Sequence, residues 1–144
     1  MLWFNDQAEE AVNLYTCLFE NSRILNTTYR PDGAVFTVEF EILGSKYTAL
    51  NGGPMYSFTE AFSICILCND QAEVDKYWDV LITDGGDPGR CGWLKDKFGL
   101  SWQIIPKQLN ECLGNPDPIK SAAAMNAMMG MSKLIVSELE AAVK

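Results

Sequence analysis

The chain has 144 residues, 48% of them hydrophobic, and a formal net charge of −8, with five cysteines and no histidine. This length predicts one domain over residues 1–144, and the negative charge argues against nucleic acid and anionic membranes as partners. The missing histidine excludes Ser-His and Cys-His nucleophile pairs and removes the commonest neutral metal ligand.

Residues 1–54 are expected to begin with a strand and a helix. An apolar run over residues 2–4 precedes a segment whose apolar residues recur at helical spacing. Asp6 and Glu9 have the spacing of a helix N-cap and its reciprocal partner. The predicted apolar face of the helix consists of Ala8, Ala11, Val12, Tyr15, Leu18 and Phe19.

Strands joined by hairpins are predicted after this helix. Residues 22–29 lead through a Pro-Asp-Gly turn into a long strand over residues 34–42, in which apolar and polar side chains alternate. A Gly-Ser turn then leads to a strand over residues 46–50. Glu39 and Glu41 share the polar face of the long strand, where solvation is their ordinary role.

Residues 60–106 repeat this order. The pentapeptide Asn5–Glu9 recurs as Asn69–Glu73, and each copy follows an apolar run and opens a helical pattern, so that Asp70 is again a predicted N-cap. The pattern indicates an internal duplication, with convergence on a good helix start as the alternative. The glycine-rich residues 85–89 follow the second helix and are interpreted as its C-cap and a turn.

The strand predicted over residues 100–105 has an unusual polar face. Trp102 lies on one face with its two apolar neighbours, whereas Ser101 and Gln103 lie on the other face with Ile105. Residues 95–99 are interpreted as a hairpin tip before this strand. The face suggests a binding surface, and an amphipathic strand with one solvated side is the alternative.

Residues 107–144 change in character. Short helices are predicted over residues 108–113 and 137–143, with a longer Ala- and Met-rich helix over residues 119–131. Met125, Met128, Met129 and Met131 have helical spacing and indicate an adaptable packing surface, with a ligand-facing patch as the alternative.

Several segments resemble the PhnB-like family, also called the 3-demethylubiquinone 3-methyltransferase-domain family, over nearly the whole chain. This family belongs to the vicinal oxygen chelate superfamily, together with glyoxalase I and bleomycin-binding proteins. The resembling segments are Trp3-Phe4, Ala8–Ala11, Tyr15, Ala49–Pro54, Trp78, Cys91–Gly99, Ser101–Gln103 and Pro106.

The resemblance implies an α+β fold of two βαβββ modules, here residues 1–54 and 60–106, with residues 107–144 as a C-terminal helical extension. In this superfamily curved sheets enclose a pocket, and modules pair within or between chains. We therefore expect a homodimer in which residues from Ile119 onward contribute contacts. The methyltransferase activity in the family name is not expected, because no Gly-rich loop follows a strand.

Metal-dependent members of the superfamily take His, Glu and sometimes Gln ligands from the first and last strands of each module. The corresponding positions here fall near Ser63, Gln103 and Asn51 or Leu50, and the remaining position lies at or before Met1. These side chains are uncharged, so a tightly bound divalent metal is disfavoured and no cofactor is predicted. Cys65 and Cys68 point to opposite faces of one strand, which argues against a zinc pair and favours structural core thiols.

The resulting hypothesis is a protein that binds a small polar or aromatic metabolite in a cleft and leaves it unchanged. The alternative is a metal-assisted lyase, isomerase or dioxygenase. A third hypothesis is that the pocket is vestigial and that the dimer surface carries the function. Weak catalytic candidates are Cys91, near Lys95 if the hairpin folds back, and the two carboxylates Glu39 and Glu41. The predicted ligand-binding residues are Asn51, Ser63, Trp93, Phe98, Ser101, Trp102 and Gln103.

Cellular context is predicted from two absences. There is no run of about 18 apolar residues that could span a membrane and no basic-then-apolar secretory pattern at the N-terminus. With an odd number of scattered cysteines, this predicts free thiols in the reducing cytoplasm.

Overall fold

The computed structural model describes residues 1–144, and the chain divides into two compact units, Met1–Phe58 and Thr59–Lys144. Each unit contains one four-stranded sheet with a helix packed on one face. The prediction that both units form a single domain stays a prediction. No helix is long and apolar enough to cross a membrane.

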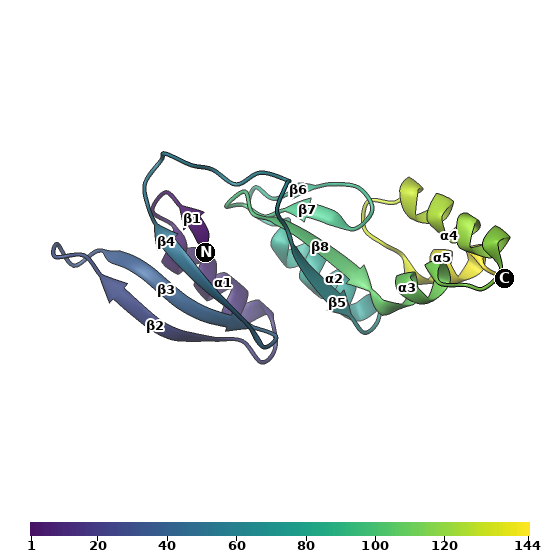
Figure 1. Cartoon of the computed structure of the whole chain (residues 1–144), viewed down its shortest axis with the longest axis horizontal. Helices are drawn as coiled ribbons and strands as arrows, with labels where there is room; N and C mark the ends of the chain where they lie inside the picture. The colour runs from purple at the N-terminus through teal and green to yellow at the C-terminus, as the bar shows by residue number, and fades with distance from the viewer. The chain divides into compact units, whose positions relative to one another are not determined.

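The first unit is a βαβββ module (Figure 1). Its strands run in the order β1-β4-β3-β2, with β1 parallel to β4 and the other neighbours antiparallel. The elements are β1 (Leu2–Phe4), α1 (Ala8–Leu18), β2 (Arg23–Tyr29), β3 (Val35–Ile42) and β4 (Ser45–Asn51).

Helix α1 covers one face of this sheet because its apolar residues recur every three or four positions. Tyr15 is fully buried and lies 6.4 Å, between ring centroids, from Phe40 of β3. Val38 and Ile42 point to the same buried side, whereas Glu39 is exposed on the other. The alternation predicted for the long strand therefore separates the core face of the sheet from an open face.

The start of α1 differs from the prediction. The N-cap residue is Gln7, which makes no side-chain capping bond, so the assignment of Asp6 as N-cap is wrong. The side chain of Asn51 replaces it: Oδ1 accepts from the backbone N–H of Ala8 at 2.8 Å, and Nδ2 donates to the Val35 carbonyl at 3.1 Å. Asn51 thus joins the end of β4 to the first turn of α1.

The second unit repeats this topology, which confirms the predicted fold of two βαβββ modules. Its strand order is β5-β8-β7-β6, and β5 is parallel to β8 as β1 is to β4. Strand β7 begins only at Trp93, because Cys91 and Gly92 before it have left-handed φ angles of 57° and 83°. The elements are β5 (Ile64–Cys68), α2 (Gln71–Leu81), β6 (Asp87–Pro88), β7 (Trp93–Lys95) and β8 (Ser101–Pro106).

Helix α2 begins as predicted. Asp70 is its N-cap and accepts from the Glu73 backbone N–H at 3.0 Å, while the Glu73 carboxylate accepts from the Asn69 backbone N–H at 2.7 Å. The helix ends at Leu81 with Ile82 as C-cap, so the assignment of residues 85–89 as the cap is wrong. These residues lie beyond the cap, and Asp87–Pro88 among them form β6 instead of a turn.

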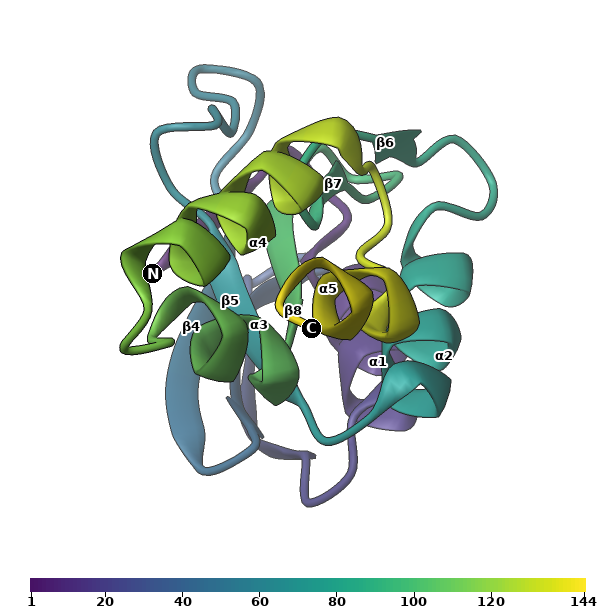
Figure 2. The same ribbon diagram turned by 90° about the vertical axis from the view of Figure 1, so that its right-hand side faces the viewer.

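The three C-terminal helices were also predicted. They are α3 (Lys107–Leu113), α4 (Pro118–Gly130) and α5 (Val136–Ala142). Figure 2 shows them gathered beside the end of β8, and they pack against one another. Their shared apolar core consists of Ile105, Leu109, Cys112, Ala124, Met131, Leu134 and Leu139.

Candidate functional site

The open face of the second sheet brings several predicted site residues together. Gln103 on β8 lies opposite Cys65 of β5 and opposite Trp93 of β7, so these three side chains form a row across neighbouring strands. The preceding row contains Ile64, Trp102 and Leu94, all of which are buried on the face that carries α2. Side chains alternate across a sheet, and the two rows therefore have different environments.

Gln103 and Ser63, which lie far apart in the sequence, are hydrogen-bonded. Nε2 of Gln103 donates to Oγ of Ser63 at 2.9 Å. Both residues are half-buried, and this bond occupies one end of the Gln103 amide. The Oε1 acceptor of the amide takes no part in this bond, and Gln103 lines the cavity on this face.

A cavity of about 340 Å³ lies on this face. Strands β5, β7 and β8 form its floor, and helices α3 and α4 contribute further walls. None of its lining residues is an Asp, Glu, Lys or Arg. The lining consists of Cys65, Leu67, Cys91, Trp93, Gln103, Ile105, Leu109, Asn110 and Met128.

A smaller cavity of about 210 Å³ is also lined by Trp93. Ser101 lines the smaller one, and its Oγ is buried without a hydrogen-bond partner in the chain. Lys95 of the same cavity contacts Glu60 at 2.9 Å and Asp87 at 3.8 Å. The hydrogen bond with Glu60 raises the pKa of Lys95 and lowers the pKa of the Glu60 carboxyl, so both stay charged at neutral pH.

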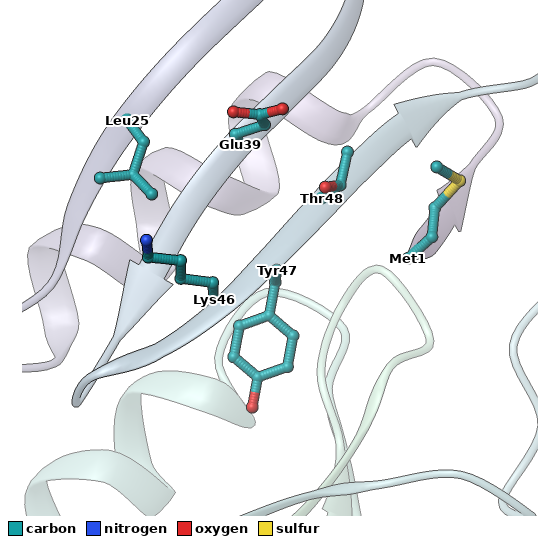
Figure 3. Close-up of a pocket in the computed structure, with 6 residues that line it drawn as sticks. All are labelled: Met1, Leu25, Glu39, Lys46, Tyr47 and Thr48. Carbon is teal, nitrogen blue, oxygen red and sulfur yellow. The ribbon is translucent and has the colours of Figure 1, made fainter.

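The first unit has its own open-face cavity of about 330 Å³ (Figure 3). The figure shows Glu39 of β3 and Thr48 of β4 side by side, with Met1 at one end. Glu39 is the one of the two predicted carboxylates that lines it, because Glu41 contacts Arg23 at 3.6 Å and lies outside the lining. The lining is Met1, Leu25, Glu39, Lys46, Tyr47 and Thr48.

Three of the predicted ligand-binding residues have other surroundings. Trp102 is fully buried, and its Nε1 donates to Asp96 at 2.8 Å, so the expectation that it lines the pocket is wrong. Asn51 uses its side chain to hold α1. Phe98 lies beneath Lys97, whose Nζ is 5.1 Å from the ring centroid, and it lines neither cavity beside Trp93.

The cysteines also differ from one another. Cys68 is buried, as expected of a core thiol, and burial raises its pKa to about 12. Cys65 is exposed on the open face, so its interpretation as a core thiol is wrong, and partial burial still raises its pKa. Cys91 lies with its Sγ 3.8 Å from the Met129 sulfur, and the expected cationic neighbour Lys95 is engaged by carboxylates instead.

These residues do not suit a divalent metal of the kind that the superfamily binds. No group of three or more His, Cys, Asp or Glu side chains lies together in the structure. Ser63 and Gln103, at positions where the resemblance implies ligands, are uncharged and bonded to each other. Uncharged oxygen donors alone give a divalent cation no charge compensation, so we derive no chemistry through a metal.

Sequence missed two features of the site. The walls from Leu109 and Asn110 come from a helix without a recognisable motif, whereas Met128 belongs to the methionine-rich segment for which a ligand-facing role was the alternative. The buried role of Asp96 was missed because a charged residue in a Lys-Asp-Lys turn has the pattern of an exposed tip. An Asp in a turn commonly accepts hydrogen bonds from backbone N–H groups a few residues ahead, and Asp96 accepts from Phe98 and Leu100. This habit of Asp was the one sequence signal that could have indicated its structural role.

Comparisons with known protein families match the two βαβββ modules and not the C-terminal helices. A family model described as 3-demethylubiquinone-9 3-methyltransferase matches residues 1–105. No curated protein matches the chain in sequence.

Solved structures share the fold. A PhnB protein from Bacillus cereus is 29% identical, with a TM-score of 0.68 over 73% of this chain and 95% of that chain. A glyoxalase/bleomycin resistance protein from Albidiferax ferrireducens is 14% identical, with a TM-score of 0.52 over 74% and 94% of the two chains. A fosfomycin resistance protein from Listeria monocytogenes, solved with Mn(II) and sulfate, is 16% identical, with a TM-score of 0.53 over 72% and 84%.

Proposed function

Because the chain belongs to the 3-demethylubiquinone-9 3-methyltransferase family of PhnB-like proteins, within the glyoxalase and vicinal oxygen chelate superfamily, we propose that it binds a small molecule without chemically changing it. The site is the open face of the second sheet. Binding there needs no tightly held metal and no general base. The protein then acts as a cytoplasmic binder of a small, partly aromatic metabolite.

The observation that carries this proposal is the cavity beside Gln103. Its 340 Å³ lies within the usual range for small-molecule sites, and it combines an aromatic wall, Trp93, with a fixed amide. The hydrogen bond to Ser63 orients that amide before any ligand arrives, which reduces the entropy lost on binding. A mainly apolar small molecule with one hydrogen-bonding group would fit such a site.

Catalysis has weaker support from the same geometry. The carboxylate candidate Glu39 lines the cavity of the first unit, whereas Gln103 and Cys91 line that of the second. Methyl transfer would need a binding loop for a methyl donor, and the glycine-rich residues 85–89 follow helix α2 instead of a strand. No observation favours the metal-assisted alternative.

The proposal is tested by titrating the full chain with N-phenyl-naphthylamine, an uncharged fluorescent probe with one N–H group. We expect saturable binding and recovery of the probe unchanged. Gln103→Leu should weaken binding by about threefold to tenfold, as for loss of one hydrogen bond. Gln7→Leu, the same change at an exposed position whose side chain makes no capping bond, should leave binding as in the wild type.

Two results would contradict it. Absence of saturable binding, or equal binding by Gln103→Leu and the wild type, would remove the proposed site. Calorimetric titration with Mn²⁺, Zn²⁺, Ni²⁺ and Fe²⁺ tests the alternative, and a tight site lost in Gln103→Leu would replace the binder with a metal-dependent protein.

A further inference from the structure

Residues 107–144 lie beyond the part of the chain that the family model matches, yet they complete the cavity beside Gln103. Leu109 and Asn110 of α3 and Met128 of α4 form walls that the βαβββ module does not supply. Without these walls the row of Cys65, Gln103 and Trp93 would face an open surface.

The segment between α4 and α5 is held against the loop before β7. The backbone N–H groups of Cys91 and Gly92 donate to the carbonyls of Met131 and Ser132, both at 2.8 Å. Arg90 adds a hydrogen bond from Nη2 to the Met129 carbonyl at 3.0 Å. Consecutive backbone bonds of this kind give the segment a defined register against the module.

The same segment is attached to helix α2 at its other end. The amide of Gln71 donates to the Leu134 carbonyl at 3.2 Å and accepts from the Val136 backbone N–H at 2.8 Å. Lys133 lies 3.0 Å from Asp75 and 2.9 Å from Asp79. The extension is therefore bound to both flanks of the second module.

Close packing at Gly92 also fixes the position of the C-terminal extension against the second module. A Cβ on Gly92 would meet the Ile104 carbonyl at 2.9 Å and the methyl groups of Ile105 and Leu134 at 3.0 Å. Glycine is required here for that close approach and for its φ of +83°. Leu134 is itself fully buried, so the extension is a fixed wall rather than a mobile cover.

The residues that α3 and α4 contribute to the cavity are uncharged, and this determines which ligands the cavity can accept. Asn110 contributes an amide, and Leu109 and Met128 contribute apolar surface. The floor adds two thiols and the Gln103 amide, and no Lys, Arg, Asp or Glu lines the cavity. Burying a charged group without a partner is costly, whereas an uncharged ring loses little on entry.

We propose that the C-terminal extension forms the selectivity wall of this cavity and restricts its ligand to an uncharged, mainly apolar molecule with a group that hydrogen-bonds Gln103. This inference rests on the proposed function. It adds the ligand class and assigns Met128 and Leu109 as specificity-determining residues.

The charge selectivity is tested with a matched pair of probes on the full chain. N-phenyl-naphthylamine and anilinonaphthalene sulfonate share the same ring system, and the second carries a sulfonate. We expect the uncharged probe to bind about tenfold or more tightly, and high salt should preserve the difference because it screens the protein's overall negative charge. Equal affinities at high salt would overturn the inference.

The role of the wall is tested with Met128→Trp, which fills the cavity from α4. We expect a loss of affinity for N-phenyl-naphthylamine of about tenfold or more at unchanged melting temperature. Asn126→Trp, on an exposed position of the same helix, is the control and should bind as the wild type. Leu109→Ala gives a second variant: it enlarges the cavity and should shift the preference toward larger uncharged probes, and it should also lower the melting temperature because Leu109 belongs to the shared core, so binding is compared at a temperature where the variant is folded.

The outcomes separate the two proposals. If the wild type binds no uncharged probe, the proposed function fails. If Gln103→Leu weakens binding while Met128→Trp and Leu109→Ala do not alter it, the site stands and the extension is not its wall.

Discussion

The buried carboxylate of Asp96 organises the turn between β7 and β8. Its Oδ1 accepts from the backbone N–H groups of Phe98 at 2.9 Å and Leu100 at 3.0 Å, and its Oδ2 accepts from Trp102 Nε1 at 2.8 Å. Hydrogen bonds to a charged acceptor in a buried place are among the strong ones. Asp96 thereby aligns β8, and with it Gln103, against β7.

Asp96→Asn should destabilise the second unit. An amide has one acceptor oxygen, so its NH₂ group would face either the backbone donors or the indole N–H of Trp102. We expect a loss of about 2 kcal/mol or more in the free energy of unfolding, measured with urea. Asp32→Asn is the matched control, because Asp32 also accepts a turn N–H, from Ala34 at 3.0 Å, at an exposed position. Similar losses for both variants would show that the Asp96 carboxylate is not required.

Cys68 should make stability depend on alkaline pH. Burial, together with the negative charge of Glu73, raises its pKa from 9.0 to about 12. Below pH 9 the thiol is protonated in both states and stability is complete. Above pH 9 the unfolded thiol ionises first, so the free energy of unfolding should fall by about 1.4 kcal/mol per pH unit until about pH 12.

The measurement compares variants between pH 8 and pH 10.5, a range set by that pKa interval. The stability cost of Cys68→Ala should shrink as pH rises, because the variant lacks the ionising thiol. Ile66→Ala, at a buried neighbouring position without a titrating group, should keep a constant cost. Parallel curves for Cys68→Ala and the wild type would refute the raised pKa.

At the level of elements, one pentapeptide starts two helices in different ways. In α2 the local Asp70 caps the first turn, whereas in α1 the capping oxygen comes from Asn51 at the end of β4. Local spacing therefore identified both helices, but it identified the cap of only one. A cap from a distant strand depends on where the sheet places that strand.

This difference predicts unequal costs for removing the two caps. Asp70→Ala removes an exposed capping bond and should cost about 1 kcal/mol. Asn51→Ala leaves a buried N–H of Ala8 and the Val35 carbonyl without partners, and should cost about 2–4 kcal/mol. Urea unfolding of the two variants provides the comparison. A smaller loss for Asn51→Ala than for Asp70→Ala would contradict the proposed role of Asn51.

At the scale of the whole molecule, helix α4 carries an exposed apolar side. Ile119 is 79% exposed, Met125 44% and Met129 54%. The predicted homodimer would use this segment, since apolar side chains gain from being covered by a second copy.

Sedimentation of the full chain tests this prediction. We expect a dimer in the wild type and a shift toward monomer when Ile119→Asp and Met125→Asp are combined. Leu43→Asp, at an exposed apolar position in the first unit, should not change the oligomeric state. A monomeric wild type, or a dimer unaffected by the paired change, would show that this helix is not the interface.

The sequence predicted more of the fold than of the candidate site. Period and alternation located α1, the long strand β3 and all three C-terminal helices, because an amphipathic pattern reflects one buried side. The resemblance to known proteins brought Ser63 and Gln103 into one site, and the structure shows them bonded. The strand that contains Trp102 was predicted correctly, but Trp102 was wrongly expected to line the pocket. Alternation showed which residues share a face of the strand, and it did not show which of the two faces is covered by α2.

By itself the sequence determined the order of strands and helices apart from the short strand β6, the two repeated modules, and an acidic chain without histidine chemistry. Each of these depends on neighbours within a few positions or on composition. Tertiary structure alone decided that Asn51 caps a helix, that Asp96 is buried, and that α3 and α4 close an uncharged cavity over Gln103. These features join segments far apart in the chain, and only packing of the folded backbone brings their side chains within contact distance.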